Sequence, residues 1–137
     1  MPAAKDTPLS IGLLLLRLGA AGLLLVGHGW PKVERWEKLS RTFADPLGVG
    51  PAVSLGLVIF AEVVCALLVM LGFATRWALA PILIFFAVAI FVRHAGSPFD
   101  ERELALIYAV PFVALMFTGP GRFALDARYE PKLRLGK

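Results

Sequence analysis

The stretch Leu9–Trp30, LSIGLLLLRLGAAGLLLVGHGW, decides the fold class, because its 22 residues carry one formal charge, on Arg17. A helix that crosses the hydrocarbon core of a bilayer needs about 20 predominantly apolar residues. The apolar region of a cleavable signal peptide is shorter, at about 7–15 residues. We therefore interpret Leu9–Trp30 as a membrane-spanning helix that the mature protein retains.

Three more apolar runs follow, at residues 53–73, 77–94 and 103–119. Glu62 interrupts the second run, whereas the last two runs are shorter and reach the bilayer surface through end residues such as Trp77 and Arg93. An alternative interpretation makes these two runs a re-entrant hairpin. We expect an all-α fold, a single membrane domain over residues 1–137, built as a four-transmembrane-helix bundle with a basic C-terminal tail at residues 122–137.

The composition excludes several classes of function. Apolar residues make up 58% of the 137 residues, against about 45–50% in an average domain, and the mean hydropathy is +0.77. A soluble chain of this size could not bury so much apolar surface. The net charge of +4 forms no basic stripe on a soluble module, so we expect no nucleic-acid partner. The single cysteine, Cys65, excludes an intrachain disulfide and a cysteine-rich metal site.

The segment Pro31–Ala52, between the first two runs, has the pattern of an amphipathic helix. Its apolar side chains recur at helical spacing, at Val33, Trp36, Leu39 and Phe43, and charged residues fill much of the rest. We expect a short helix that lies in the membrane interface.

The distribution of basic residues predicts the orientation. Four spans place both chain ends on one side of the bilayer, together with the turn between the second and third spans. That side carries seven Lys and Arg residues, against six on the other side. Because the side with more Lys and Arg faces the cytoplasm, we expect a multi-pass protein of the cell inner (plasma) membrane with both termini cytoplasmic.

Arg17 and Glu62 are the charged residues that lie far from the ends of the predicted spans. A charge at the helix centre costs about 2.5–3.5 kcal/mol on insertion scales, and such residues usually face the bundle interior and pair. Counting 1.5 Å per residue from the ends of the apolar runs places both at nearly the same depth. We predict a buried Arg17–Glu62 ion pair. It either locks the packing or serves a function, in which Glu62 takes up a proton or Arg17 binds an anionic or quinone-like head group.

Polar residues gather on the side opposite the chain ends. His28 shares a helix face with Arg17, because eleven residues are close to three helical turns, and Lys32, His94 and Glu103 lie at span ends on the same side as His28. Two histidines with carboxylates can bind a metal, but this spacing matches no recognised ligand motif, so we predict no metal site. The other interpretations are hydrogen bonding at the membrane boundary and proton exchange with a quinone, since the pKa of histidine lies near neutrality.

Three stretches resemble the DoxX family of membrane proteins. They are Arg17-Leu-Gly with His28-Gly-Trp-Pro-Lys32, Glu62 with Leu71-Gly-Phe-Ala-Thr-Arg76, and Glu103-Leu-Ala-Leu with Gly119-Pro-Gly-Arg-Phe-Ala-Leu-Asp126. Together they cover about residues 9–128, nearly the whole chain. The resemblance implies a four-helix membrane protein. It also marks the residues to test, which are Arg17, His28, Lys32, Glu62, Arg76 and Glu103.

The resemblance further implies a link to redox chemistry, because the family takes its name from a subunit of a thiosulfate:quinone oxidoreductase and other members are tied to oxidative-stress complexes. The family is functionally mixed, so its fold alone does not select one activity or decide whether the chain is an enzyme. The leading hypothesis is an inner-membrane subunit of a quinone-linked oxidoreductase, with a protein partner that brings the redox centre. The competing hypothesis is a non-catalytic scaffold or assembly factor, and a homo-oligomer is the alternative to a separate partner. The candidate quinone and proton site consists of His28, Lys32, Arg76, His94 and Glu103.

Overall fold

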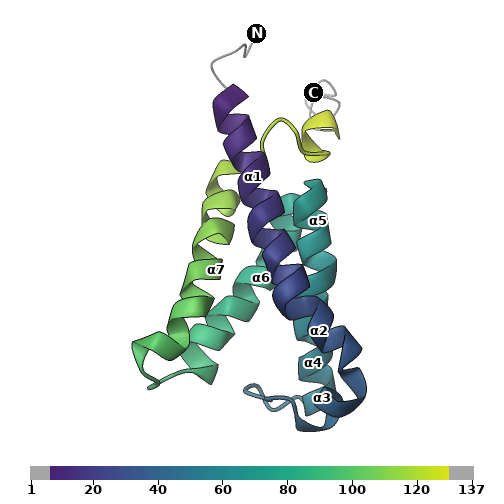
Figure 1. Ribbon diagram of the computed structural model, residues 1–137, viewed down its shortest axis with the longest axis vertical. Helices are drawn as coiled ribbons and strands as arrows, with labels where there is room; N and C mark the ends of the chain where they lie inside the picture. The colour runs from purple at the N-terminus through teal and green to yellow at the C-terminus, as the bar shows by residue number, and fades with distance from the viewer. Residues whose placement is uncertain (1–6, 130–137) are drawn as a thin grey trace, which may run out of the picture.

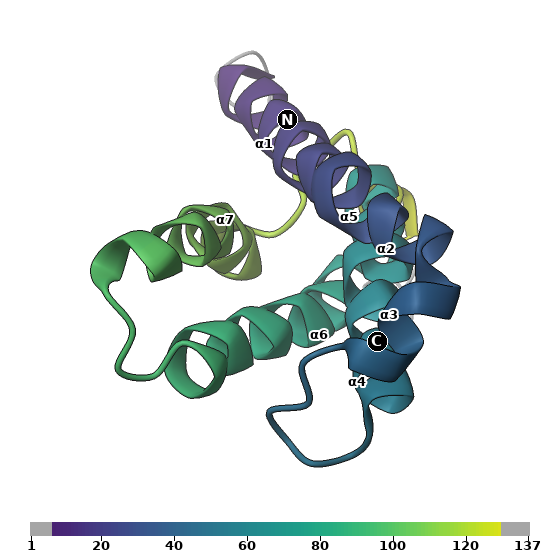
Figure 2. The same ribbon diagram turned by 60° about the horizontal axis from the view of Figure 1, so that its bottom comes forward.

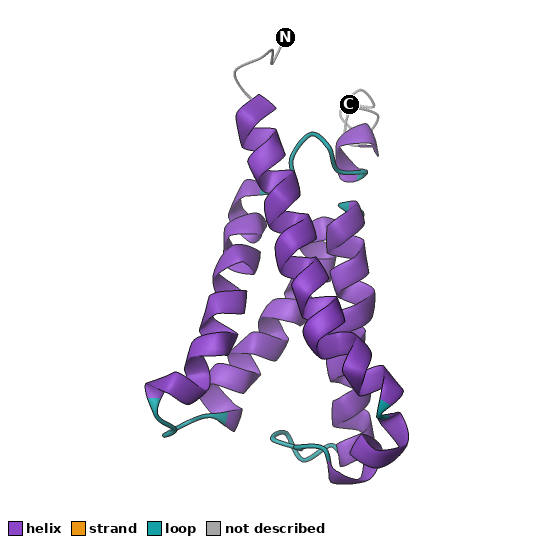
Figure 3. Ribbon diagram, in the orientation of Figure 1, coloured by secondary structure: helices purple, strands orange, loops and turns teal. Residues whose placement is uncertain are grey.

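The computed structural model describes residues 7–129, and every regular element in that range is a helix (Figure 3). The predicted all-α fold is confirmed for these residues. Residues 130–137, which form half of the predicted basic tail, lie outside the described range, as do residues 1–6. In chain order the helices are α1 (Thr7–Leu24), α2 (Trp30–Glu34), α3 (Trp36–Thr42), α4 (Pro51–Ile59), α5 (Ala66–Leu71), α6 (Thr75–Val88) and α7 (Phe99–Thr118).

Three π-helical turns within the described range join or extend these helices. They are Leu25–Gly29 between α1 and α2, Phe60–Cys65 between α4 and α5, and Ala89–Arg93 after α6. Such turns are rare, and they frequently occur at functional sites. The three resulting continuous helices are Thr7–Glu34, Pro51–Leu71 and Thr75–Arg93. We call them the first, second and third long helices.

These three long helices, of 28, 21 and 19 residues, are the helices in residues 7–129 that are long and apolar enough to cross a membrane. They contain nearly all of the first three predicted spans. α7 has 20 residues and contains most of the fourth, but its first turns carry four charges in a row, from Asp100 to Glu103. The long apolar helices indicate a multi-pass membrane protein.

The helices pack so that both ends of the described chain meet at one end of the molecule. α1 packs against α5 and α7, and α6 packs against α5 and α7. The start of α1, the turn between α5 and α6, and residues 119–129 lie together at the top of Figure 1. We call this the terminal end. The opposite end holds α3 and the loops 43–50 and 94–98, and comes forward in Figure 2; we call it the α3 end.

The first part of the segment between the first two predicted spans is helical, as its periodicity predicts, because most of α2 and all of α3 lie in it. The loop after α3 is organised by Asp45, whose carboxylate accepts hydrogen bonds from the hydroxyl of Ser54 and from the N–H groups of Val49 and Gly50. These bonds, above all the one from Ser54, hold the pKa of Asp45 below its usual range. The predicted location of α3 in the membrane interface stays a prediction.

Apolar side chains lie both inside and outside the bundle. Leu79, Ile82 and Phe112 are fully buried between the helices. Large apolar side chains also point outward, where lipid tails, which are as apolar as leucine, can cover them. Those more than three-fifths exposed include Val26, Trp77, Ile84, Phe91, Val110 and Phe117.

Candidate functional site

Arg17 and Glu62 are both buried, with 1% and 2% of their surface exposed, but they do not pair with each other. Nη1 of Arg17 donates to the carbonyl oxygens of Val69, at 3.2 Å, and Met70, at 2.9 Å. Glu62 Oε2 lies 2.7 Å from Nζ of Lys32 and forms a salt bridge with it. The predicted Arg17–Glu62 ion pair is therefore wrong, because each charge has a different set of partners.

Helix register explains the correction. Gly29 lies directly against the backbone of Glu62, since a Cβ placed on Gly29 would be 2.7 Å from the Glu62 carbonyl oxygen. Arg17 precedes Gly29 by 12 residues, which is about 18 Å along a helix and beyond the reach of its side chain. The sequence-based depths were measured from the ends of apolar runs, whereas the first long helix continues to Glu34.

Lys32 and Glu62 converge because helical side chains tilt toward the N-terminus of their helix. Lys32 lies near the α3 end of the first long helix, so its side chain tilts away from that end, toward the level of Glu62. Glu62 belongs to a helix of opposite direction and tilts toward the α3 end. Lys32 Nζ also donates to the carbonyl oxygen of His28 at 3.0 Å, so these two bonds use two of its three donors.

A cavity of about 210 Å³ lies beside this salt bridge. All three long helices and α7 contribute to its wall, and each π-helical turn supplies one lining residue, namely His28, Glu62 and Ala89. The three irregular turns of the fold thus meet at one place. The other lining residues are Leu24, Lys32, Phe85, Phe86, His94, Glu101, Leu104, Ala105 and Tyr108.

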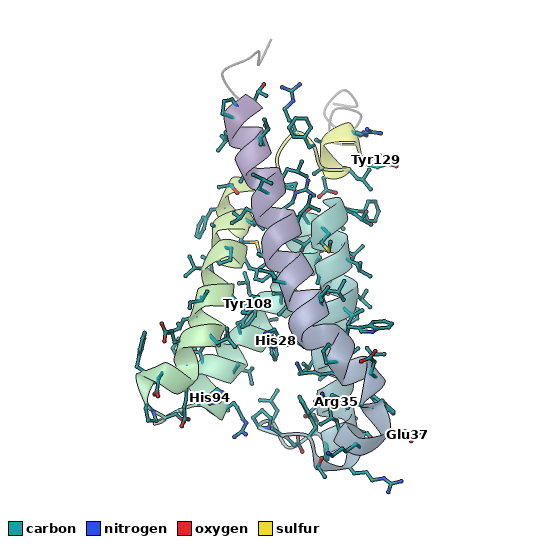
Figure 4. All side chains as sticks on the ribbon, viewed as in Figure 1. His28, Arg35, Glu37, His94, Tyr108 and Tyr129 are labelled. Carbon is teal, nitrogen blue, oxygen red and sulfur yellow. The ribbon has the colours of Figure 1, made fainter. Side chains whose placement is uncertain are left out.

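One wall of the cavity is aromatic. The ring of Tyr108 is nearly parallel to that of Phe86, with centroids 6.1 Å apart. The ring of Phe86 also stacks against that of Phe112, with centroids 6.0 Å apart. His28 meets Tyr108 edge to face at 5.2 Å. Figure 4 shows His28 and Tyr108 facing each other between the first long helix and α7, with His94 nearer the α3 end. The cavity therefore combines aromatic rings with groups that donate, accept and hold protons.

The structure brings together three of the five predicted quinone and proton residues, His28, Lys32 and His94, and adds Glu62 to them. Glu103 is exposed and does not line the cavity, although Glu101 and Leu104 on either side of it do. Arg76 lies in the first turn of α6, at the terminal end.

The candidate site predicted from the sequence did not include Tyr108, Phe86 or Glu101, which line the cavity. The spacing of Glu101, Leu104 and Tyr108 at i, i+3 and i+7 places them on one helix face. That face could not be chosen from the sequence, because α7 is apolar around most of its circumference. The available signal was Tyr108 itself, a hydroxyl-bearing ring inside a predicted span.

A second polar cluster closes the turn between α5 and α6 at the terminal end. Arg17 binds the last carbonyls of α5, where the helix dipole favours a positive charge. Asp126 caps the start of α6, because its carboxylate accepts hydrogen bonds from the N–H groups of Ala74 and Thr75 and from the Thr75 hydroxyl. The Asp126 N–H in turn donates to the carbonyl oxygen of Gly72 at 2.8 Å. These bonds give Arg17 and Asp126 structural roles.

Comparison with known proteins agrees with the fold and with the motifs. A family model described as DoxX matches residues 12–95, more than half of the chain. The match includes Arg17, His28, Lys32, Glu62 and Arg76, whereas Glu103 and Asp126 lie beyond it. No curated protein and no solved structure matches the chain. A multi-pass helical fold and a family match over this length together show that the chain belongs to the DoxX family.

Proposed function

We propose that this protein is the quinone-binding membrane subunit of an oxidoreductase, and that the cavity beside Lys32 and Glu62 receives the quinone head group. The observation that carries the proposal is the combination of an aromatic wall with polar side chains inside a membrane bundle. The proposal includes four spans in the inner membrane with both termini cytoplasmic.

α7 supports the fourth span. Its outward side chains form a continuous apolar stripe, with Ile107, Val110 and Phe117 at 60%, 67% and 82% exposure. A soluble helix would lose stability by leaving such a stripe in water. Its charged residues from Asp100 to Glu103 lie in the first turns, where they reach the interface at the α3 end.

The cavity matches the size and chemistry of a quinone ring. At about 210 Å³ it is smaller than the roughly 300–1,000 Å³ of pockets for drug-sized ligands, so it suits a single ring with its isoprenoid tail among the lipids. The rings of Tyr108, Phe86 and Phe85 supply apolar surface for the quinone ring. The third N–H of Lys32, the hydroxyl of Tyr108 and the imidazole of His28 can bind the ring oxygens.

The electrons must come from a partner. The side chains that line the cavity can donate, accept and hold protons, but none of them transfers an electron pair as a flavin or a dithiol does. We therefore assign the redox centre to a second protein, with this chain as its quinone-binding anchor.

Quinone binding can be tested without knowing the partner. The protein is purified from its native membrane, its lipids are extracted and bound quinone is identified by chromatography. Binding of decylubiquinone and menadione is then titrated in nanodiscs for wild type, Tyr108→Ala and Lys32→Met. We expect each variant to bind at least one of the two quinones about tenfold more weakly, a loss of about 1.4 kcal/mol.

Phe117→Ala is the matched control, because Phe117 also lies on α7 but is 82% exposed on its outer face. It should bind both quinones as wild type does. If all four proteins bind both quinones equally, the signal reflects partition into lipid and the proposal is wrong. A quinone-free protein that copurifies with a stoichiometric partner would instead identify a scaffold.

A further inference from the structure

Of the titratable side chains that line the cavity, Glu62 is the most buried, and Glu101, which lies at the α3 end, is the most exposed. Glu62 is 2% exposed, and the side chain of Lys32 is 20% exposed. His28 and His94 are half-buried, and Glu101 is exposed. Tyr108, also half-buried, completes the titratable groups that line the cavity. The polar lining therefore leads from the bundle interior toward one surface of the molecule.

His94 and Glu101 mark the outer part of this lining. They lie on either side of the loop 94–98, which joins the third long helix to α7 at the α3 end. Figure 4 shows His94 at that end, beyond the facing pair of His28 and Tyr108. At the terminal end the corresponding space is filled by buried side chains of the core, such as Leu79 and Leu115, and by the cluster around Arg17.

The inner part of the lining can store and pass on protons. Among the described residues, Lys32 uses two of its three donors in hydrogen bonds, and Glu62 uses one of its two carboxylate oxygens. Both residues line the cavity. A cavity of about 210 Å³ has room for several waters at about 30 Å³ each. These waters would have carboxylate, ammonium and imidazole groups as partners.

From the contrast between buried Glu62 and exposed Glu101 we infer that the cavity, before a quinone enters it, is a water-filled vestibule open to the α3 end. Through it Lys32 and Glu62 exchange protons with that side of the membrane only. The use of these protons to reduce a quinone rests on the proposed function, whereas the water-filled vestibule does not. Reduction of a quinone to a quinol takes two electrons and two protons. The electrons come from the partner's reduced flavin or dithiol. Each proton passes from the Lys32–Glu62 pair to a ring oxygen and is replaced from water at the α3 end.

Cysteine labelling tests the vestibule independently of any quinone. Ala105→Cys places a thiol in the cavity wall, and Ile107→Cys, two residues further along α7, places one on the outer face. Each variant is treated with a charged, membrane-impermeant methanethiosulfonate in membrane vesicles of both orientations. The native chain is the blank, because its Cys65 is 1% exposed.

Two exposed positions serve as reference thiols that show which end of the protein faces the reagent. They are Ala95→Cys for the α3 end and Arg76→Cys for the terminal end. We expect the thiol at position 105 to react only in vesicles where the thiol at position 95 reacts, and at least tenfold faster than the thiol at position 107. No reaction from either side, or reaction from the side of position 76, would overturn the vestibule. As a control, the thiol at position 105 is also labelled in detergent. Reaction there shows that a lack of labelling in vesicles reflects inaccessibility and not a missing thiol.

The same variant separates this inference from the proposed function. Decylubiquinone in the cavity should slow the labelling of Ala105→Cys, and Tyr108→Ala should reduce that protection. One-sided labelling without protection by decylubiquinone or menadione would retain the vestibule and reject the quinone. Protection by a quinone combined with labelling from the terminal side would retain the quinone and reject the vestibule.

Discussion

Gly29 of the first long helix lies against the backbone of Glu62, so closely that a Cβ would come within 2.7 Å of the Glu62 carbonyl oxygen and 2.9 Å of Val63 Cγ2. This contact sets the register between the first two long helices. Lys32 follows Gly29 by three residues, so the same contact brings its ammonium group to the Glu62 carboxylate.

Gly29→Ala should separate the two helices and destabilise the protein. Overpacking of this kind costs about 1–3 kcal/mol, and unfolding by sodium dodecyl sulfate in mixed micelles measures it. Gly27→Ala is the matched control, because a Cβ there meets nothing within 4 Å. Equal stability of the two variants would show that the close approach at Gly29 does not exist.

Lys32 and Glu62 should be coupled energetically. Removing one partner of a buried pair leaves an uncompensated charge, at a cost of about 3–5 kcal/mol. We expect the lower end of this range, because water in the adjacent cavity can solvate the remaining charge. Lys32→Met and Glu62→Gln should each destabilise the protein, and the double variant should lose less than the sum of the two. A double-mutant cycle in mixed micelles measures the coupling. Strictly additive losses would argue against the salt bridge.

Asp126→Asn should weaken the turn between α5 and α6. The substitution removes the charge and one of the two acceptor oxygens that bind Ala74 and Thr75, and loss of a helix cap costs about 0.5–2 kcal/mol. Hydrogen exchange of the first turn of α6 should accelerate. Asp100→Asn, an exposed change in the first turn of α7, should leave that exchange unaltered. Unchanged exchange in Asp126→Asn would remove the capping role.

Asp45 should make the loop 43–50 sensitive to acid. Its pKa is lowered in the folded protein, chiefly by the hydrogen bond from Ser54. The stabilisation is therefore fully present above the ordinary aspartate pKa of about 3.9 and is lost as the pH falls through the lower folded value. Protease cleavage of this loop in vesicles should increase below about pH 4 in wild type. In Asp45→Asn it should be fast and independent of pH, and a wild-type-like pH profile in that variant would contradict the assignment.

The sequence predicts the membrane helices and the end of the molecule at which polar groups gather. Long apolar runs identify spans because the bilayer sets their length, and alternating spans then place His28, Lys32 and His94 at one end. The cavity that contains these three residues lies toward that end. Such inferences need only the order of residues along each helix.

What the sequence could not give is the register and rotation of one helix against another. The partner of Glu62 depends on the contact at Gly29, a single close approach between long helices. The inward face of α7, with Tyr108, depends on rotation, and a helix that is apolar on most sides carries little information about which face is buried. Arg76 entered the candidate site through the family resemblance alone, and its place at the terminal end separates it from the cavity.

The cluster around the turn between α5 and α6 has a consequence for biosynthesis. The second and third long helices can enter the membrane as a hairpin, but Asp126, which caps the turn, is synthesised more than fifty residues later. The hairpin turn is therefore completed only after α7 has been synthesised, by the segment that also brings Ala124 against Gly72. A nascent chain that stops before this segment leaves the N–H groups of Ala74 and Thr75 without the Asp126 carboxylate that caps them.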